Sequence, residues 1–225
     1  MPNSVSFNSL LERVRDIVSG KILSKDSMNT KDYLDCSYGI FSGWKNKFSL
    51  TNLKQVGENG FASYIHDFLP ESGNGSWSGL ARHKPDIEAN IGILYENVIT
   101  LLRSKGNVGE VKEYLTTFSS SGSKNHFNGQ SVFLLTAILF ANDEDNFMVL
   151  DSPVREFYGR DSNNSAVEIY DSIIRTSQSL AKSSGLKMWY INKAYAVHSI
   201  GDMIDLKRLN GKCLNHYTKN MRVHI

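Results

Sequence analysis

Residues 127–160 read FNGQSVFLLTAILFANDEDNFMVLDSPVREFYGR, and this stretch says more about the fold than any other part of the 225-residue chain. A glycine turn at Gly129 precedes the nearly unbroken apolar run 132–141. Ten residues rise only about 15 Å as a helix, roughly half of what a bilayer requires. We therefore expect a helix buried in a protein core, then a polar link and a second helix.

The second helix is predicted to begin at Ser152-Pro153, because proline at the first helical position loses no needed donor. The segment 146–150 fits a short strand or an extended link equally well. Asp151 follows this apolar segment and precedes the helix. At such a position, partial burial raises the pKa of a carboxylate, whereas the helix dipole lowers it.

Helical spacing dominates the rest of the chain. The predicted helices cover 5–18, 61–69, 85–101, 108–115, 169–180, 188–197 and 202–209. Ser9 with Glu12 and Ser165 with Glu168 have the spacing of capping boxes. Pro70 and Gly185 are predicted to end their helices.

We therefore predict an all-α protein with two lobes and a helix-hairpin-helix-like element. The serine-rich break at 119–124 separates an N-terminal helical lobe, 1–118, from a second lobe, 119–225. A single domain over 1–225 is the alternative.

Composition narrows the function classes. Hydrophobic residues make up 40% and charged residues 21%, which is typical of a folded protein. The net charge of +2 excludes a histone-like polycation, so a nucleic-acid site must come from local patches. Two cysteines are too few for a disulfide scaffold, a four-cysteine zinc site or a cysteine-ligated iron–sulfur cluster. Because the N-terminus does not resemble a signal peptide, we expect a cytoplasmic protein that is not bound to a membrane. We also expect it to need no cofactor or metal.

The order of elements in 127–160 resembles the helix-hairpin-helix DNA glycosylases of the endonuclease III and alkyladenine-glycosylase type. In that family a glycine hairpin leads into a buried helix, and a catalytic aspartate opens the next helix about twenty residues later. The resemblance implies that Gly129, Gln130 and Ser131 form the hairpin and contact duplex DNA. It also implies that Asp151 is the catalytic carboxylate and that Arg160 assists in binding.

Several positions depart from the family pattern. Asn128 replaces the usual proline, Ser131 replaces the second glycine, and Thr136-Ala137 is shifted by a few positions. Phe133 occupies the place where bifunctional members carry a Schiff-base lysine. The resemblance therefore implies DNA repair by monofunctional base excision, without lyase chemistry by that lysine, or no excision.

A second resemblance is to helical domains attached to restriction and phage-defence proteins, including some in McrB-like systems. It is carried by 145–152, DNFMVLDS, and by 77–82, WSGLAR. This resemblance implies a non-catalytic module that recognises DNA or binds a restriction or defence partner. In that case, Asp151 and Ser152 only cap the helix that starts at Pro153.

Two further segments are candidates for DNA contact. The loop with Trp77, Arg82 and Lys84 places an aromatic ring beside cations, a combination that supports an extruded base. It fits equally a loop that plugs the core with its tryptophan. The stretch after Asp205 is basic, with Lys207 and Arg208 nearest, and can follow a phosphate backbone or be a polar tail.

A nuclease string is also present, as Pro85-Asp86 with Glu110-Val111-Lys112. Metal-dependent nuclease chemistry needs these groups on adjacent strands around Mg²⁺. Both pieces have helical spacing, so we interpret the match as chance. The histidines and cysteines show no zinc-type spacing.

Overall fold

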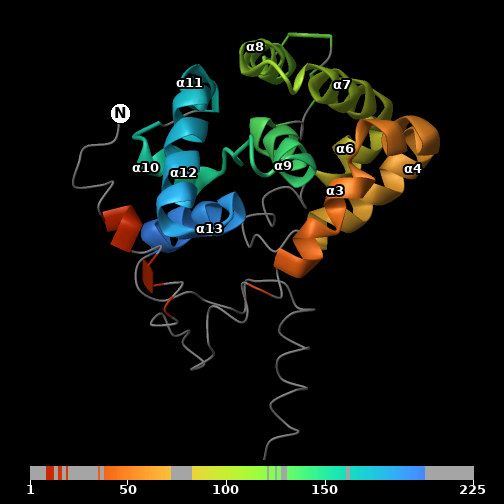
Figure 1. Cartoon of the computed structure of the whole chain (residues 1–225). Coiled ribbons are helices and arrows are strands. Elements are labelled where there is room, and N and C mark those ends of the chain that lie inside the picture. The colour runs from red at the N-terminus through yellow and green to blue at the C-terminus, as the bar shows by residue number, and fades with distance from the viewer. Residues whose placement is uncertain are drawn as a thin grey trace, which may run out of the picture.

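The protein is described from a computed structural model that covers residues 9–12, 15, 16, 19, 35, 38–71, 83–120, 122–124, 126, 127, 131–160 and 163–200. Every regular element in these ranges is a helix, and they contain no strand (Figure 1). This confirms the predicted all-α class.

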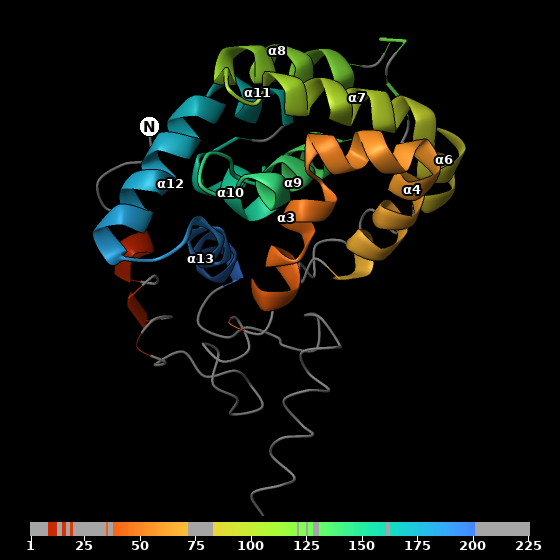
Figure 2. The same ribbon diagram turned by 45° about the vertical axis from the view of Figure 1, so that its right-hand side comes forward.

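The structure describes ten named helices within these ranges. They are α3 (Trp44–Lys47), α4 (Leu50–Glu71), α6 (Lys84–Ala89), α7 (Ile91–Ser104), α8 (Val108–Ser119), α9 (Val132–Asn142), α10 (Ser152–Phe157), α11 (Asn163–Glu168), α12 (Tyr170–Ser184) and α13 (Met188–Ile200). In Figure 2, α9 and α10 lie between α12 on one side and α3 and α4 on the other, with α7 and α8 above them and α13 below.

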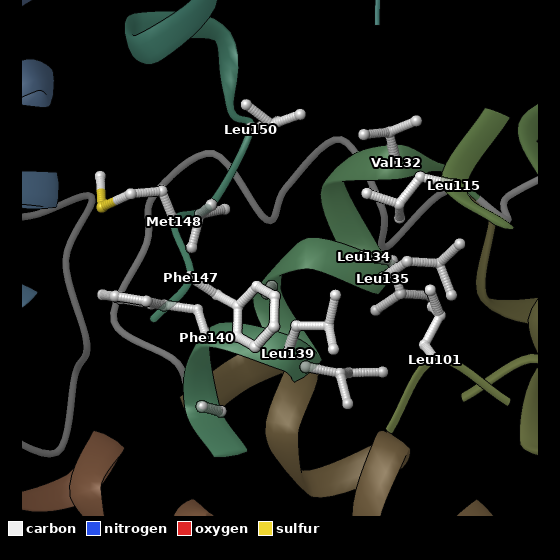
Figure 3. Packing of buried hydrophobic residues seen from close by; sticks show 14 of the residues in the cluster. Leu101, Leu115, Val132, Leu134, Leu135, Leu139, Phe140, Phe147, Met148 and Leu150 are labelled. Carbon is white, nitrogen blue, oxygen red and sulfur yellow. The ribbon is translucent and has the colours of Figure 1, made fainter. Parts of the chain in front are cut away.

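Helix α9 is the centre of the core. All of its residues except Phe133 are buried, and a helix that is apolar on every side must be enclosed by others. Figure 3 shows Leu101 of α7 and Leu115 of α8 on the side of Leu134. The opposite side of α9 meets the segment 147–150. The predicted buried helix over 132–141 is confirmed.

The sequence left open whether 146–150 forms a short strand or an extended link. The structure shows a link at 147–150 and no strand there. All four of its side chains are buried, and two hydroxyl groups form hydrogen bonds with its backbone. Thr136 Oγ1 accepts from Leu150 N at 3.0 Å, and Tyr170 Oη donates to Met148 O at 2.6 Å. A buried peptide group without such partners is costly. These bonds therefore fix the path of the chain into Asp151.

Several predicted helix ends are confirmed by local chemistry. Asn107 begins α8 by accepting from the Gly109 and Glu110 amides, and Ser152-Pro153 begins α10. Gly185 ends α12 with φ 70°, a left-handed conformation that favours glycine. The start of α13 at Met188 is also as predicted.

Other predicted boundaries are wrong. The expected single helix over 85–101 is divided into α6 and α7 at Asn90. The Asn90 side-chain amide donates to Asp86 O at 2.8 Å, a local bond that competes with helix continuation. Ser165 lies inside α11 and does not cap α12, whose N-cap residue is Ile169. The predicted second capping box is therefore not formed.

The helix expected over 61–69 is also longer than predicted. It begins at Leu50, bends at Gly57 (φ 66°), and continues through Pro70 to Glu71. Residues 9–12 are helical, in agreement with the predicted helix over 5–18, whereas the predicted helix over 202–209 lies outside the described residues. One buried cluster includes residues on both sides of position 118, such as Leu115 and Leu135. The division into lobes 1–118 and 119–225 stays a prediction.

Within the described ranges, every helix falls short of the length and apolarity needed to cross a bilayer.

Candidate functional site

Asp151 lies at the junction between the extended link and α10. Its Oδ1 accepts a hydrogen bond from Val154 N at 3.1 Å, which makes it the N-cap of that helix. The residue is only 4% exposed. The aspartate on which the glycosylase resemblance depends is thus buried, and its carboxylate forms a hydrogen bond with the helix that it caps.

Lys193, on α13, faces the same buried region and is 6% exposed. Its Nζ lies 5.0 Å from the centre of the Trp189 ring. Helix α13 packs closely on α10, which brings this ammonium into the electrostatic range of Asp151. The contact between α10 and α13 therefore contains one carboxylate and one ammonium, both buried away from water. We call Asp151 and Lys193 the buried charge pair.

The pKa values of the buried charge pair are shifted toward each other. Burial raises the pKa of Asp151 to about 6, and this rise is opposed by the Val154 amide and by the charges of Lys193 and Arg155. Burial also lowers the pKa of Lys193 to about 8, while the Asp151 charge opposes that fall. Desolvation therefore outweighs attraction at both groups, as it commonly does for ions deep in a protein.

Hydroxyl groups line the neighbouring contact between α10, α12 and α13. Tyr195 Oη lies 3.1 Å from both Tyr158 Oη and Ser177 Oγ. The Tyr195 ring packs edge-on against Phe157, with 5.0 Å between the ring centres. Burial raises the pKa of Tyr195, so this phenol stays neutral. The group is a satisfied polar network that joins three helices.

The predicted hairpin is represented by one residue only. Ser131 is the N-cap of α9, and its Oγ accepts from Leu134 N at 3.3 Å. Gly129 and Gln130 lie outside the described residues. The predicted alignment of the glycine turn with Asp151 along one nucleic-acid strand therefore stays a prediction.

Of the remaining predicted DNA contacts, the structure describes Lys84 and Arg160. Lys84 is exposed at the start of α6 and forms an ion pair with Glu88 at 3.6 Å. Arg160 is half-buried just after α10, where its amide donates to Arg155 O. Trp77, Arg82, Lys207 and Arg208 lie outside the described residues.

The nuclease-like string does not form a metal site. Asp86 lies on α6, whereas Glu110 and Lys112 lie on α8, so neither piece is on a strand. Lys112 Nζ is engaged elsewhere: it donates to Glu168 O at 2.7 Å and pairs with Asp171 on α12. The interpretation of this string as chance agrees with the geometry.

Two groups were missed by sequence reasoning. Lys193 is an isolated cation in the apolar segment 188–197, and that isolation was an available signal. Tyr38, Glu144 and Lys187 come together from distant parts of the chain. Their association depends on tertiary contacts, because 149 positions separate Tyr38 from Lys187.

Comparisons of the chain with protein-family models, with curated proteins and with solved structures gave no match in any of the three.

Proposed function

We propose that the protein is a non-catalytic, DNA-binding helical module in which Asp151 supports the fold. The observation that carries the non-catalytic part is the state of the Asp151 carboxylate. It caps α10, is 4% exposed, and has the buried Lys193 as its counter-charge. A catalytic carboxylate must come within hydrogen-bond reach of a reacting group. Asp151 is shielded from such contact.

DNA is the proposed partner because of two features. Residues 127–160 resemble the helix-hairpin-helix element, in which the turn before a buried helix presents its amides to a phosphate. The chain after Asp205 carries five lysines and arginines and no acidic residue. Such a run gains affinity by releasing counterions from the duplex. The resemblance to helical domains of restriction and phage-defence proteins supports the same function.

Base excision is the second candidate, and one observation favours it. Strongly shifted pKa values concentrate at catalytic sites, and both members of the buried charge pair are shifted toward neutrality. For excision, α10 would have to move away from α13 so that the carboxylate could reach a flipped nucleotide. Stabilising the positive charge on the sugar would then be the role of Asp151.

Binding of the full chain to a labelled DNA duplex over a series of salt concentrations tests the proposal. We expect affinity to fall steeply as salt rises. Replacing Lys207 and Arg208 together with Gln should weaken binding and flatten the salt dependence. The control exchanges Lys54 and Lys182 for Gln, which removes two exposed charges from α4 and α12. Absence of binding at low salt would contradict both DNA functions.

A panel of duplexes with damaged or modified bases separates the two candidates. If the protein is a non-catalytic module, the native protein should produce no abasic sites in these duplexes. Release of a base by the native protein, lost in Asp151→Asn while binding is kept, would establish excision. Asparagine is also a good N-cap, so this variant keeps the acceptor for Val154 and removes only the charge.

A further inference from the structure

A pocket of about 260 Å³ opens beside α3, the end of α9 and the start of α13. It is separate from the buried charge pair, and none of the candidate site residues named from the sequence lines it. The residues that matter here are Tyr38, Phe41, Lys45, Glu144, Asp145 and Lys187. At roughly 30 Å³ for each water-sized group, the volume accommodates about nine such groups. The pocket thus suits a very small molecule.

A chain of hydrogen bonds runs along one wall of this pocket. Tyr38 Oη donates to Glu144 Oε1 at 2.6 Å and accepts from Lys187 Nζ at 2.7 Å. The Lys187 ammonium also lies 4.2 Å from the centre of the Tyr38 ring. These contacts hold the phenol, the carboxylate and the ammonium in fixed positions. The wall is therefore organised before any ligand arrives.

One carboxylate oxygen on this wall has no partner. Glu144 Oε2 is buried, yet it accepts no hydrogen bond from any group in the described part of the chain. An unsatisfied buried acceptor is costly, and a charged one more so. This oxygen is closed to solvent, so it is the pocket-lining part of the Glu144 side chain that a ligand ammonium can meet.

Two cations of the pocket have hydrogens to spare. Lys45 is exposed, and its Nζ forms no hydrogen bond or ion pair with the residues that the structure describes. Lys187 Nζ donates to Tyr38 and makes no second hydrogen bond within those same residues. A carboxylate between these two ammonium groups would accept charge-assisted hydrogen bonds, which are stronger than neutral ones.

The charges of the pocket select the class of ligand. Lys45 and Lys187 are balanced by Glu144 and Asp145, so the site as a whole is neutral. A phosphate dianion would meet the two acids, and a simple cation would meet the two lysines. A zwitterion satisfies both pairs. Phe41 and Ala141 are buried and supply an apolar floor for a small side chain.

We propose that this pocket is a binding site for a free α-amino acid, whose ammonium group contacts Glu144 and whose carboxylate lies between Lys45 and Lys187. The site is independent of DNA binding. The protein would therefore be a module whose helical core also senses or carries a small zwitterion.

Calorimetric titration of the full chain with L-serine, L-leucine and L-glutamate at millimolar concentration tests the proposal. Each is compared with its N-acetyl and its amide derivative, because these remove one of the two charges. We expect at least one free amino acid to bind, and its derivatives to bind about tenfold more weakly or worse. Equal binding of a derivative, binding of inorganic phosphate instead, or no binding of any free amino acid would overturn the proposal.

Variants locate the site. Glu144→Gln keeps an acceptor for Tyr38 but removes the negative charge, and should weaken binding about tenfold or more. Lys45→Met should weaken it similarly without risk to the fold, because Lys45 is exposed. The matched controls are Glu96→Gln on α7 and Lys54→Met on α4, both exposed. Unchanged binding in Lys45→Met and Glu144→Gln together would place the ligand elsewhere.

Discussion

Two lysine–carboxylate groups lie near helix α13 and differ in their access to water. In the buried charge pair, Asp151 and Lys193 are 4% and 6% exposed. In the pocket, Lys187 is exposed, and Tyr38 connects it to the half-buried Glu144. Burial raises the pKa of Asp151 and lowers that of Lys193, whereas hydrogen bonding to Tyr38 raises the pKa of Lys187.

The comparison teaches that residue type does not separate a structural site from a binding site. A lysine and a carboxylate form a structural contact in the buried charge pair, and they line the proposed binding site in the pocket around Tyr38. Enclosure is the deciding variable, since groups without access to solvent cannot meet a ligand while the fold is intact.

The largest expected effect comes from breaking the buried charge pair. Lys193→Met should lower the free energy of unfolding by about 3–5 kcal/mol at pH 7, because it leaves a buried carboxylate without its counter-charge. The double variant Asp151→Asn with Lys193→Met should recover much of this loss. Urea unfolding at equilibrium measures both. Lys182→Met, at an exposed position of α12, serves as the control and should change stability by less than about 0.5 kcal/mol. A double variant as unstable as the single one would show that the pair does not act as a unit.

A second, smaller effect is a pH dependence carried by Asp151. Its pKa is raised in the folded state, from 3.8 to about 6, so the folded protein holds this proton more tightly than the unfolded chain does. The resulting stability is complete below about pH 4 and is lost as the pH rises through about 6, by at most about 3 kcal/mol. Unfolding free energies of the native protein and Asp151→Asn, measured from pH 4 to 7, should therefore differ in slope. Parallel curves would mean that the carboxylate is not desolvated.

The smallest stability effect should come from the open group. Tyr38→Phe keeps the ring against Trp189, 5.7 Å away between ring centres, but removes the phenol that joins Glu144 to Lys187. Because partly exposed polar links add little, we expect thermal unfolding to report a loss of less than about 1 kcal/mol. A loss as large as that of Lys193→Met would erase the proposed distinction between the two groups.

The sequence was sufficient for the elements with strong local signals. The apolar run 132–141 predicted a buried helix, Ser152-Pro153 predicted the start of α10, and Gly185 predicted the end of α12. The predicted helix boundaries were wrong where a local feature interrupts or bends a helix. Asn90 bonds back to Asp86 O and divides a helix whose apolar spacing continues unbroken. Gly57 bends α4, although the helix resumes beyond it.

For the candidate site, the sequence identified Asp151 and left open whether it reacts or caps. The sequence could predict that Asp151 lies at the start of a helix, because an N-cap contacts residues that are close to it in the chain. What only the tertiary structure decided is its partner and its enclosure. Lys193 approaches from α13, some forty positions away, and the hydroxyls of Thr136 and Tyr170 fix the link that leads to it. Burial, charge pairing and the pocket around Tyr38 all arise from packing between distant segments, which local periodicity does not encode.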